Sequence, residues 1–332
     1  MDLNLLNRLF KIGRIFALTP ASINNQNPNL FQKCHQFLIL FLYTGCLIVA
    51  KIIVYSPYYR RLTSVHKILL IFMNLNFYAH SFYVLIVLMV TRRSRWFKLI
   101  HNLQCVDSQF NFLQKSHWLI IVLAHVIFCI IISSRIYIYL EFCDLTFAGL
   151  NIIECFENYS LLFCAICSCV VLNLLLSRYK HQNLLLTKPR IDINEVKYNL
   201  YMLRETVNIY NDIFGWTTLL NIFDGALKCL RYIDIMVKDK NIWTSLLIQI
   251  GILATVLLSD AILKEYEKIF NVVFKMQYSS DDKQCRSVFS VVLHNRPEFT
   301  AARFFVIDRS ALFAIFNGII TFLLVVLQYR ST

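Results

Sequence analysis

The chain has 332 residues, of which 58% are hydrophobic and 16% are charged, and its mean hydropathy is +0.56. This composition excludes an ordinary soluble domain and a disordered chain, and it predicts a polytopic membrane protein. The formal net charge of +13 does not indicate nucleic-acid binding in such a protein, because Lys and Arg accumulate in the cytoplasmic segments of membrane proteins.

The predicted fold class is an all-α membrane protein with seven transmembrane helices. Residues 1–36 are expected to be a cytoplasmic N-terminal segment without a signal peptide, because the polar stretch 24–29 precedes the first apolar run. The predicted spans are 37–55, 67–90, 118–140, 152–176, 210–230, 242–263 and 310–329. An acidic turn is expected at 141–149, between the third and fourth spans.

Two amphipathic patterns predict helices that continue outside the membrane. Asp192 and Glu195 have the spacing of a capping box, and apolar residues from Val196 onward recur at helical intervals, which predicts a cytoplasmic helix at 192–209 that runs into the fifth span. A second apolar stripe, from Leu263 to Phe274, follows the sixth span. Residues 264–309 are therefore predicted to form a cytoplasmic anchor region.

Polar residues inside the predicted spans are candidates for a ligand pocket, because ionisable groups in a membrane are costly. Each of them either contacts a ligand or is satisfied by a neighbouring helix. Asp224 and Lys228 lie one helical turn apart and are expected to neutralise each other. Cys143 and Cys155 are both expected outside the cell, where the two could form a disulfide bond. The candidate pocket residues are Asn76, His80, Arg135, Tyr139, Glu154, Asn158, Asn221 and Asp224.

The last span has a face that is polar at both ends and apolar in the middle. Thr321 and Gln328 are seven residues apart and share a helix face, with Leu324 and Val325 between them. A buried amide without a partner is costly in lipid, so this face suits a helix that lines a pore. The alternative for Gln328 is an interfacial amide bonded to a neighbouring helix. Tyr329 is either part of a gate or a member of an aromatic belt.

The distribution of Lys and Arg predicts the orientation. With the N-terminus in the cytoplasm, the inner segments hold 23 of these residues, and the outer segments hold 8 when Lys67 and Lys228 at the outer ends of their spans are included. This bias places the N-terminus inside and the C-terminus outside. A metabotropic seven-helix receptor requires the opposite orientation.

A family resemblance is found in the C-terminal residues. Residues 299–310, followed by Thr321-Phe322, five aliphatic residues and Gln328-Tyr329, resemble the C-terminal signature of insect gustatory receptors, whose pattern is Thr-Tyr, five hydrophobic residues and Gln-Phe. The resemblance implies a tastant-gated cation channel in the plasma membrane of sensory neurons, built as a homotetramer or a heterotetramer with related subunits. It implies a pore lined by the seventh helix, with Thr321, Leu324, Val325, Gln328 and Tyr329 as pore or gate residues. It also implies a ligand pocket in the outer half of each subunit.

Arg303, Asp308 and Arg309 lie between the anchor region and the seventh span. They are read either as a gating coupler or as a basic stop at the inner membrane surface. The competing functions are a metabotropic receptor, an odorant-receptor-like channel and a transporter. No enzyme activity, cofactor or metal is expected, because the sequence shows no catalytic constellation, and Cys164 and Cys167 lie in an apolar run where Cys acts as a small hydrophobe.

Overall fold

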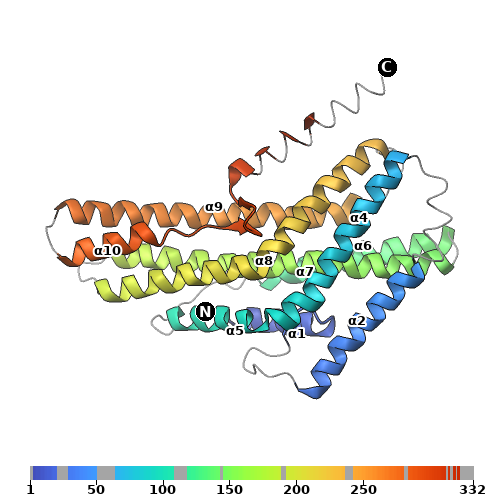
Figure 1. Cartoon of the computed structure of the whole chain (residues 1–332), viewed down its shortest axis with the longest axis horizontal. Helices are drawn as coiled ribbons and strands as arrows, with labels where there is room; N and C mark the ends of the chain where they lie inside the picture. Colours follow the sequence, from blue (N-terminus) through green and yellow to red (C-terminus); the bar gives the residue numbers. More distant parts are fainter. Residues whose placement is uncertain are drawn as a thin grey trace.

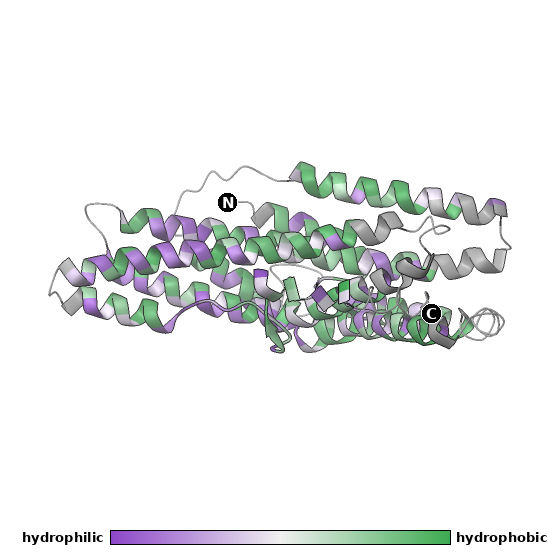
Figure 2. Ribbon diagram, turned by 90° about the horizontal axis from the view of Figure 1, so that it is seen from above, coloured by the Kyte–Doolittle hydropathy of each residue, from purple (hydrophilic) through white to green (hydrophobic). Residues whose placement is uncertain are grey.

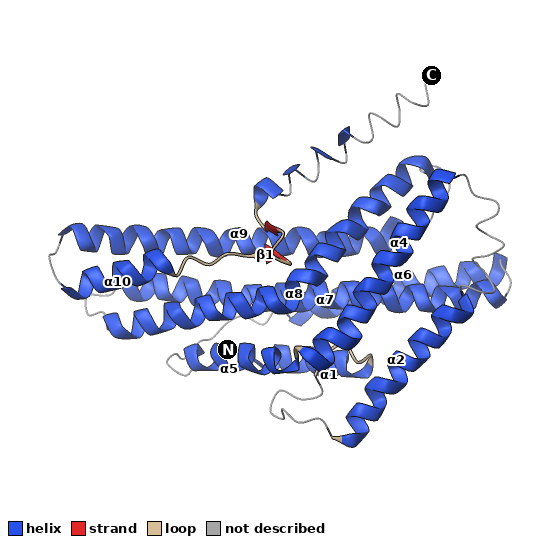
Figure 3. Ribbon diagram, viewed as in Figure 1, coloured by secondary structure: helices blue, strands red, loops and turns tan. Residues whose placement is uncertain are grey.

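The chain was analysed as a computed structural model that describes residues 3–20, 29–50, 64–107, 118–142, 145–187, 192–235, 242–279 and 283–311, and the pieces 313–314, 317–318 and 320–321. Within these residues it is almost entirely helical, with one two-stranded hairpin (Figure 3). The all-α prediction is confirmed. The elements are α1 Leu3–Ile15, α2 Leu30–Ala50, α4 Ser64–Phe82, the π-helix η2 Tyr83–Thr91, α5 Arg93–Asp107, α6 Trp118–Phe142, α7 Leu145–Leu186, α8 Ile193–Ile235, α9 Ile242–Ser279, α10 Lys283–His294, β1 Thr300–Ala301 and β2 Phe305–Val306.

Three long helices, α7, α8 and α9, run along the length of the molecule (Figure 1). They contain 42, 43 and 38 residues, so each is roughly 60 Å long at about 1.5 Å per residue. That is about twice the ~30 Å hydrocarbon core of a bilayer. Figure 2 shows hydrophilic residues concentrated toward the end that holds α10, and apolar residues toward the opposite end. Each long helix therefore has an apolar half and an amphipathic half.

Within the part of the chain that the structure describes, four helical stretches are long and apolar enough to cross a membrane: Leu30–Val49, Lys67–Thr91, Ile153–Leu186 and Leu247–Tyr278. They overlap the first, second, fourth and sixth predicted spans. The third predicted span is helical, but its described apolar part, Trp118–Ser134, is shorter. The fifth lies in α8, where Asn221, Asp224 and Lys228 interrupt the apolar run. The seventh is described only in part, so the membrane class is supported and the number of seven stays a prediction.

The predicted acidic turn at 141–149 is wrong. Helix α6 continues to Phe142 and α7 begins at Leu145, so Gly149 lies inside a helix. The residues from Leu145 to Leu150 are mostly apolar and propagate α7, whereas Glu141 and Asp144 had suggested a longer polar connection. Helix α2 also begins earlier than expected, because the Asn29 N–H donates to Gln32 Oε1 at 3.2 Å and caps the first turn.

The amphipathic helix before the fifth span is present as the first part of α8. Asp192 Oδ1 accepts hydrogen bonds from the N–H groups of Asn194 at 3.0 Å and Glu195 at 3.2 Å, so the expected cap at Asp192 forms. Val196, Leu200 and other residues of the predicted stripe are buried. The helix then continues to Ile235 without interruption.

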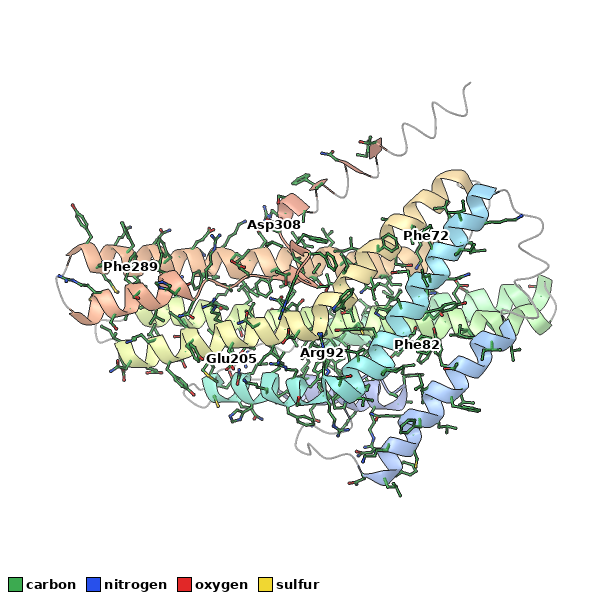
Figure 4. All side chains as sticks on the ribbon, in the orientation of Figure 1. Phe72, Phe82, Arg92, Glu205, Phe289 and Asp308 are labelled. Atoms are coloured by element: carbon green, nitrogen blue, oxygen red, sulfur yellow. The ribbon has the colours of Figure 1, made fainter. Side chains whose placement is uncertain are left out.

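Helix α5, which the sequence analysis did not predict, packs along α8. Trp96, Leu99 and Leu103 on α5 are almost fully buried. On the polar side, Glu205 of α8 accepts from Lys98 Nζ at 2.6 Å and from Asn102 Nδ2 at 3.1 Å. The Lys98 ammonium holds the pKa of the Glu205 carboxyl below its ordinary value. Figure 4 shows Glu205 between the two helices, which fixes α5 against the amphipathic half of α8.

Candidate functional site

A cluster of buried polar side chains lies in the apolar half, and it draws on α2, α4, α7, α8 and α9. At its centre Lys228 Nζ lies 2.7 Å from Asp224 Oδ2, one turn earlier on α8. The two side chains are 7% and 0% exposed, so the expected neutralisation is confirmed in a fully desolvated place. Lys228 also donates to Asn158 Oδ1 at 3.3 Å and stands 4.9 Å from the ring centroid of Phe77. The ammonium thus joins α4, α7 and α8.

A second buried carboxylate extends the cluster toward α2. Glu157 accepts a hydrogen bond of 2.8 Å from the Tyr43 hydroxyl, and both residues are buried. The neighbouring Asn158 donates from Nδ2 to the carbonyl of Glu154 at 2.8 Å. Asn158-Tyr159-Ser160 has the pattern of an N-glycosylation site, but Asn158 is 1% exposed and is bonded at both ends of its amide, so it is inaccessible in this fold. Adjacent residues of α7 therefore connect α2 with α8.

Several buried polar atoms of the cluster have no hydrogen-bond partner within the described chain. They include both ring nitrogens of His80, Asn76 Oδ1, Asn221 Oδ1 and Gln249 Nε2. Asn76 does donate from Nδ2 to the Leu220 carbonyl at 3.0 Å, which holds α4 against α8. A buried polar group left unsatisfied costs roughly 1–3 kcal/mol. A polar small molecule or water that entered this region would supply the missing partners.

Gly225 lets α9 approach α8 inside the cluster. A Cβ atom at this position would lie 2.3 Å from Nε2 of Gln249, which is closer than atoms pack. The absence of a side chain is what places the Gln249 amide against α8, one residue after Asp224. Glycine thereby adds a polar side chain from a fifth helix, α9, to the site.

The structure brings together most of the predicted pocket residues. Asn76, His80, Asn158, Asn221 and Asp224 are all buried within this cluster, and each is 3% exposed or less. Glu154 lies beside it, half-buried, one turn before Asn158. The side chains of Arg135 and Tyr139 lie outside the described residues, as does Cys143, so neither those pocket assignments nor the disulfide is placed.

Two members of the cluster had no signal in the sequence. Tyr43 stands in an apolar run where nothing distinguishes it from a lipid-facing aromatic residue. Gln249 stands alone among aliphatic residues of α9. Only the fold shows that Tyr43 reaches Glu157 and that Gln249 reaches Gly225.

A strained hairpin precedes the last helix. Strands β1 and β2 pair antiparallel, with Thr300 opposite Val306 and Ala301 opposite Phe305. The turn residues Ala302 and Arg303 have φ angles of 50° and 65°. This left-handed conformation costs a residue with a side chain roughly 1–2 kcal/mol. Such a turn persists only because its surroundings hold it.

Helix α8 provides those surroundings. Asn211 Nδ2 donates to the Glu298 carbonyl at 2.6 Å, and Asn211 Oδ1 accepts from the Thr300 N–H at 3.0 Å. One turn later, a Cβ atom on Gly215 would lie 2.9 Å from the backbone nitrogen of Ala302. The hairpin is therefore seated directly on the backbone of α8.

The three predicted coupler residues all lie at this junction. Arg303 pairs with Asp212 of α8 at 3.5 Å, and Arg309 pairs with Asp260 of α9 at 2.8 Å. Arg303 is 86% exposed, so its ion pair contributes little to stability. Asp308, labelled in Figure 4, accepts from the Ala311 N–H at 2.8 Å and from the Ser310 hydroxyl at 2.7 Å. These two donors hold the pKa of the Asp308 carboxyl below its ordinary value.

The described part of the last helix is exposed in the single chain. Residues 309–311, 313–314, 317–318 and 320–321 are helical or continue the helix, and they rise away from α9 (Figure 1). Phe313 is 67% exposed and Ile320 is 52% exposed. Thr321 donates to the Asn317 carbonyl at 2.8 Å. Leu324, Val325, Gln328 and Tyr329 lie outside the described residues, so their pore assignment stays a prediction.

The arrangement defines a class: an all-α protein with several apolar helices, a buried polar cluster among them and an amphipathic helical region beyond. No family model matches the chain, and no curated protein matches it. Among solved structures, the chain is similar to the insect olfactory receptor OR5 from Machilis hrabei in complex with eugenol. The TM-score is 0.65, the sequence identity is 14%, and the match covers 98% of each chain. At this identity the likeness establishes a shared fold along the whole chain.

Proposed function

We propose that the chain is a subunit of a ligand-gated cation channel of the insect chemoreceptor kind. The observation that carries the proposal is the shared fold with the insect olfactory receptor over 98% of both chains. The buried polar cluster supports it independently, because groups such as Asp224 and Lys228 inside apolar helices mark functional sites in membrane proteins. The permeant species in this proposal are cations, and the channel is a tetramer of this chain or of this chain with related subunits.

The particular function proposed is taste reception. It is supported by the resemblance of residues 299–310 and 321–329 to the gustatory-receptor signature. An odorant-receptor-like channel is the second candidate, and the solved olfactory receptor with the same fold favours it. Both candidates share seven spans with a cytoplasmic N-terminus, and both place the protein in the plasma membrane of sensory neurons.

In this proposal the pore is lined by the last helix. Its described side chains beyond Ala311 are all exposed, including Phe313 and Ile320. An apolar helix exposed on several sides requires lipid or other subunits to cover it. Four symmetry-related copies would place Gln328 in a ring, with Leu324 or Val325 as an apolar constriction that dewets when it is narrow.

The ligand site of the proposal is the buried polar cluster. A small, partly apolar molecule that carries a hydrogen-bonding group would satisfy His80, Asn76 or Asn221, whose polar atoms lack partners in the described chain. Such a ligand opens the channel only if it binds the open state more tightly than the closed state.

Whole-cell recording tests the channel proposal. Cells that express the chain, alone and with related subunits, would be exposed to sugars, bitter compounds, amino acids and volatile odorants while G-protein signalling is blocked. Ligand-evoked cation current that persists under the block supports a channel. Current that disappears under the block overturns it in favour of a metabotropic receptor. The ligand class that evokes current decides between the gustatory and the olfactory candidates.

A substitution separates ligand binding from folding. His80→Leu removes an imidazole that is 1% exposed and unpartnered, so thermal stability is expected to stay equal or to rise. The ligand concentration for half-maximal current is expected to rise at least tenfold. His101→Leu, at an exposed position of α5, is the matched control and should leave the current unchanged. An unchanged response in His80→Leu would remove this residue from the ligand site.

A further inference from the structure

A cavity that shares none of the described residues of the polar cluster lies between α1 and the start of α2. It has a volume of about 360 Å³. Two basic side chains from α1 and three nitrogen-bearing side chains from α2 line it, together with apolar residues at its rim. Its lining residues are Lys11, Arg14, Ile15, Ala17, Thr19, Phe31, Gln32, His35 and Gln36. No carboxylate is among them.

The floor of this cavity is built by the end of α1. Ala17 has a φ angle of 54°, and the Leu18 N–H donates to the Gly13 carbonyl at 2.8 Å. This turn brings Thr19 back so that its hydroxyl donates to the Phe10 carbonyl at 2.9 Å. A Cβ on Gly13 would lie 2.6 Å from the Thr19 hydroxyl oxygen, so glycine is needed for this return. The cavity is therefore shaped by specific contacts.

Helix α1 has three basic residues, and two of them, Lys11 and Arg14, line the cavity on the outer face of the bundle, whereas Arg8 lies 5.1 Å from the centroid of the Trp118 ring. Leu6, Leu9 and Phe10 are 2% exposed or less and pack into the main core, which leaves Lys11 and Arg14 on the exposed face. Among the described residues that line the cavity there is no opposite charge. Residues 3–106 contain twelve Lys and Arg residues and no Asp or Glu. The two cations therefore attract an anion from outside the chain.

The surroundings of the cavity decide which anion fits. Ile15 and Phe31 at the rim are 62% and 74% exposed, and Leu30 beside them is 79% exposed. Only 11% of the apolar stretch Leu30–Val49 is buried, so lipid must cover most of α2. A free anion would gain nothing from this apolar rim. A phospholipid would place its phosphate between Lys11 and Arg14 and its acyl chains along α2.

We propose that the cavity between α1 and α2 binds the headgroup of an anionic phospholipid. The first turn of α2 adds to the attraction, because the N-terminus of a helix favours negative charge. The positive-inside bias puts this end of α2 at the cytoplasmic leaflet, where anionic lipids are enriched. Only the assignment of this site to the cytoplasmic leaflet rests on the proposed function. The binding site itself does not depend on any channel activity.

Binding is measured on the full-length protein in a neutral detergent, which removes the charged membrane surface. The probe is a fluorescent dioctanoyl phosphatidylinositol bisphosphate, followed by fluorescence polarisation. The double variant Lys11→Gln/Arg14→Gln is expected to weaken binding by at least tenfold. The control Lys180→Gln/Lys275→Gln removes the same charge at exposed positions outside the cavity and should change binding less than twofold. Equal losses in the two double variants would overturn the site.

Two further arms identify the source of the phosphate. Soluble inositol trisphosphate is expected to compete at least tenfold more weakly than the dioctanoyl lipid, and dioctanoyl phosphatidylcholine is expected not to compete. Phe31→Ala, at an exposed position, should weaken the lipid without weakening the soluble headgroup. Equal competition by the soluble headgroup would overturn the lipid in favour of a free phosphate compound. Because no arm uses current or tastant, failure here leaves the channel proposal untouched, and failure of the channel proposal leaves these results standing.

Discussion

Removing the ammonium at the centre of the polar cluster gives the sharpest test of how the apolar half is held together. At 2.7 Å the Lys228–Asp224 pair has a Coulomb attraction of about 6 kcal/mol for an effective dielectric constant of about 20. Most of this attraction is offset by the desolvation of two groups that are 7% and 0% exposed. Lys228→Met removes the attraction and leaves the Asp224 carboxylate buried and unpaired. We expect a loss of roughly 3–5 kcal/mol, as for other broken buried pairs.

The double variant Asp224→Asn/Lys228→Met should recover most of that loss, because it buries no charge. The assay is thermal unfolding of the purified protein in detergent, with retention of the monodisperse peak as the readout. About 2–4 °C per kcal/mol, the sensitivity of domains of 150–250 residues, predicts a fall of roughly 6–20 °C for the single variant. If the single and double variants unfold together near the wild-type temperature, the pair carries no such energy. If both fall equally, the loss comes from packing around Lys228 and the electrostatic reasoning is refuted.

Three further outcomes are expected. Gly215→Ala should destabilise the protein and reduce evoked current, because its Cβ would lie 2.9 Å from the Ala302 nitrogen, whereas Gly45→Ala, with nothing within 4 Å, should be neutral or stabilising in thermal unfolding. Asp308→Ala should lower the stability by about 1 kcal/mol, because it removes the helix cap. The folded-state pKa of Asp308 is lowered, so the wild-type cap is complete above the ordinary pKa of 3.8 and is lost only as pH falls through the lower folded-state pKa. Gating should therefore show no Asp308-dependent change between pH 5 and 8. Gln328→Ala should alter single-channel conductance or ion preference, and a variant channel identical to wild type in both and in gating would exclude Gln328 from the pore.

Hydrophobic runs were enough to predict the helical membrane class. A membrane-spanning segment must form its backbone hydrogen bonds within itself, as a helix does, and must present apolar side chains to the lipid. Spacing alone was enough for the pair of Asp224 and Lys228, since both partners lie on one helix face. The cap at Asp192 was predicted for the same reason. Each of these interactions is local in the sequence.

Features that depend on distant residues were not predicted. Helix α5 carries Arg95 and Lys98, and their carboxylate partners, Asp212 and Glu205, lie more than a hundred residues later in the chain. Tyr43 needed Glu157, which is 114 residues away. The turn at Ala302 and Arg303 contradicts local preference, because neither residue favours a positive φ. That turn is held by Asn211 and by the missing side chain of Gly215, neither of which marks a turn in the sequence.

Helix α8 connects the two regions to which function is assigned. Asn211 and Gly215 seat the hairpin that leads into the last helix, and Asp224 and Lys228 centre the polar cluster. Thirteen residues separate Asn211 from Asp224, which is about 20 Å along one unbroken helix. Under the proposed function, a ligand that shifts α8 at Asp224 also shifts the seat of the hairpin, since a helix moves as a rigid element. The strained turn at Ala302 and Arg303 is held in place by its contacts with α8. A shift of α8 therefore moves the turn, and with it the helix that begins at Arg309.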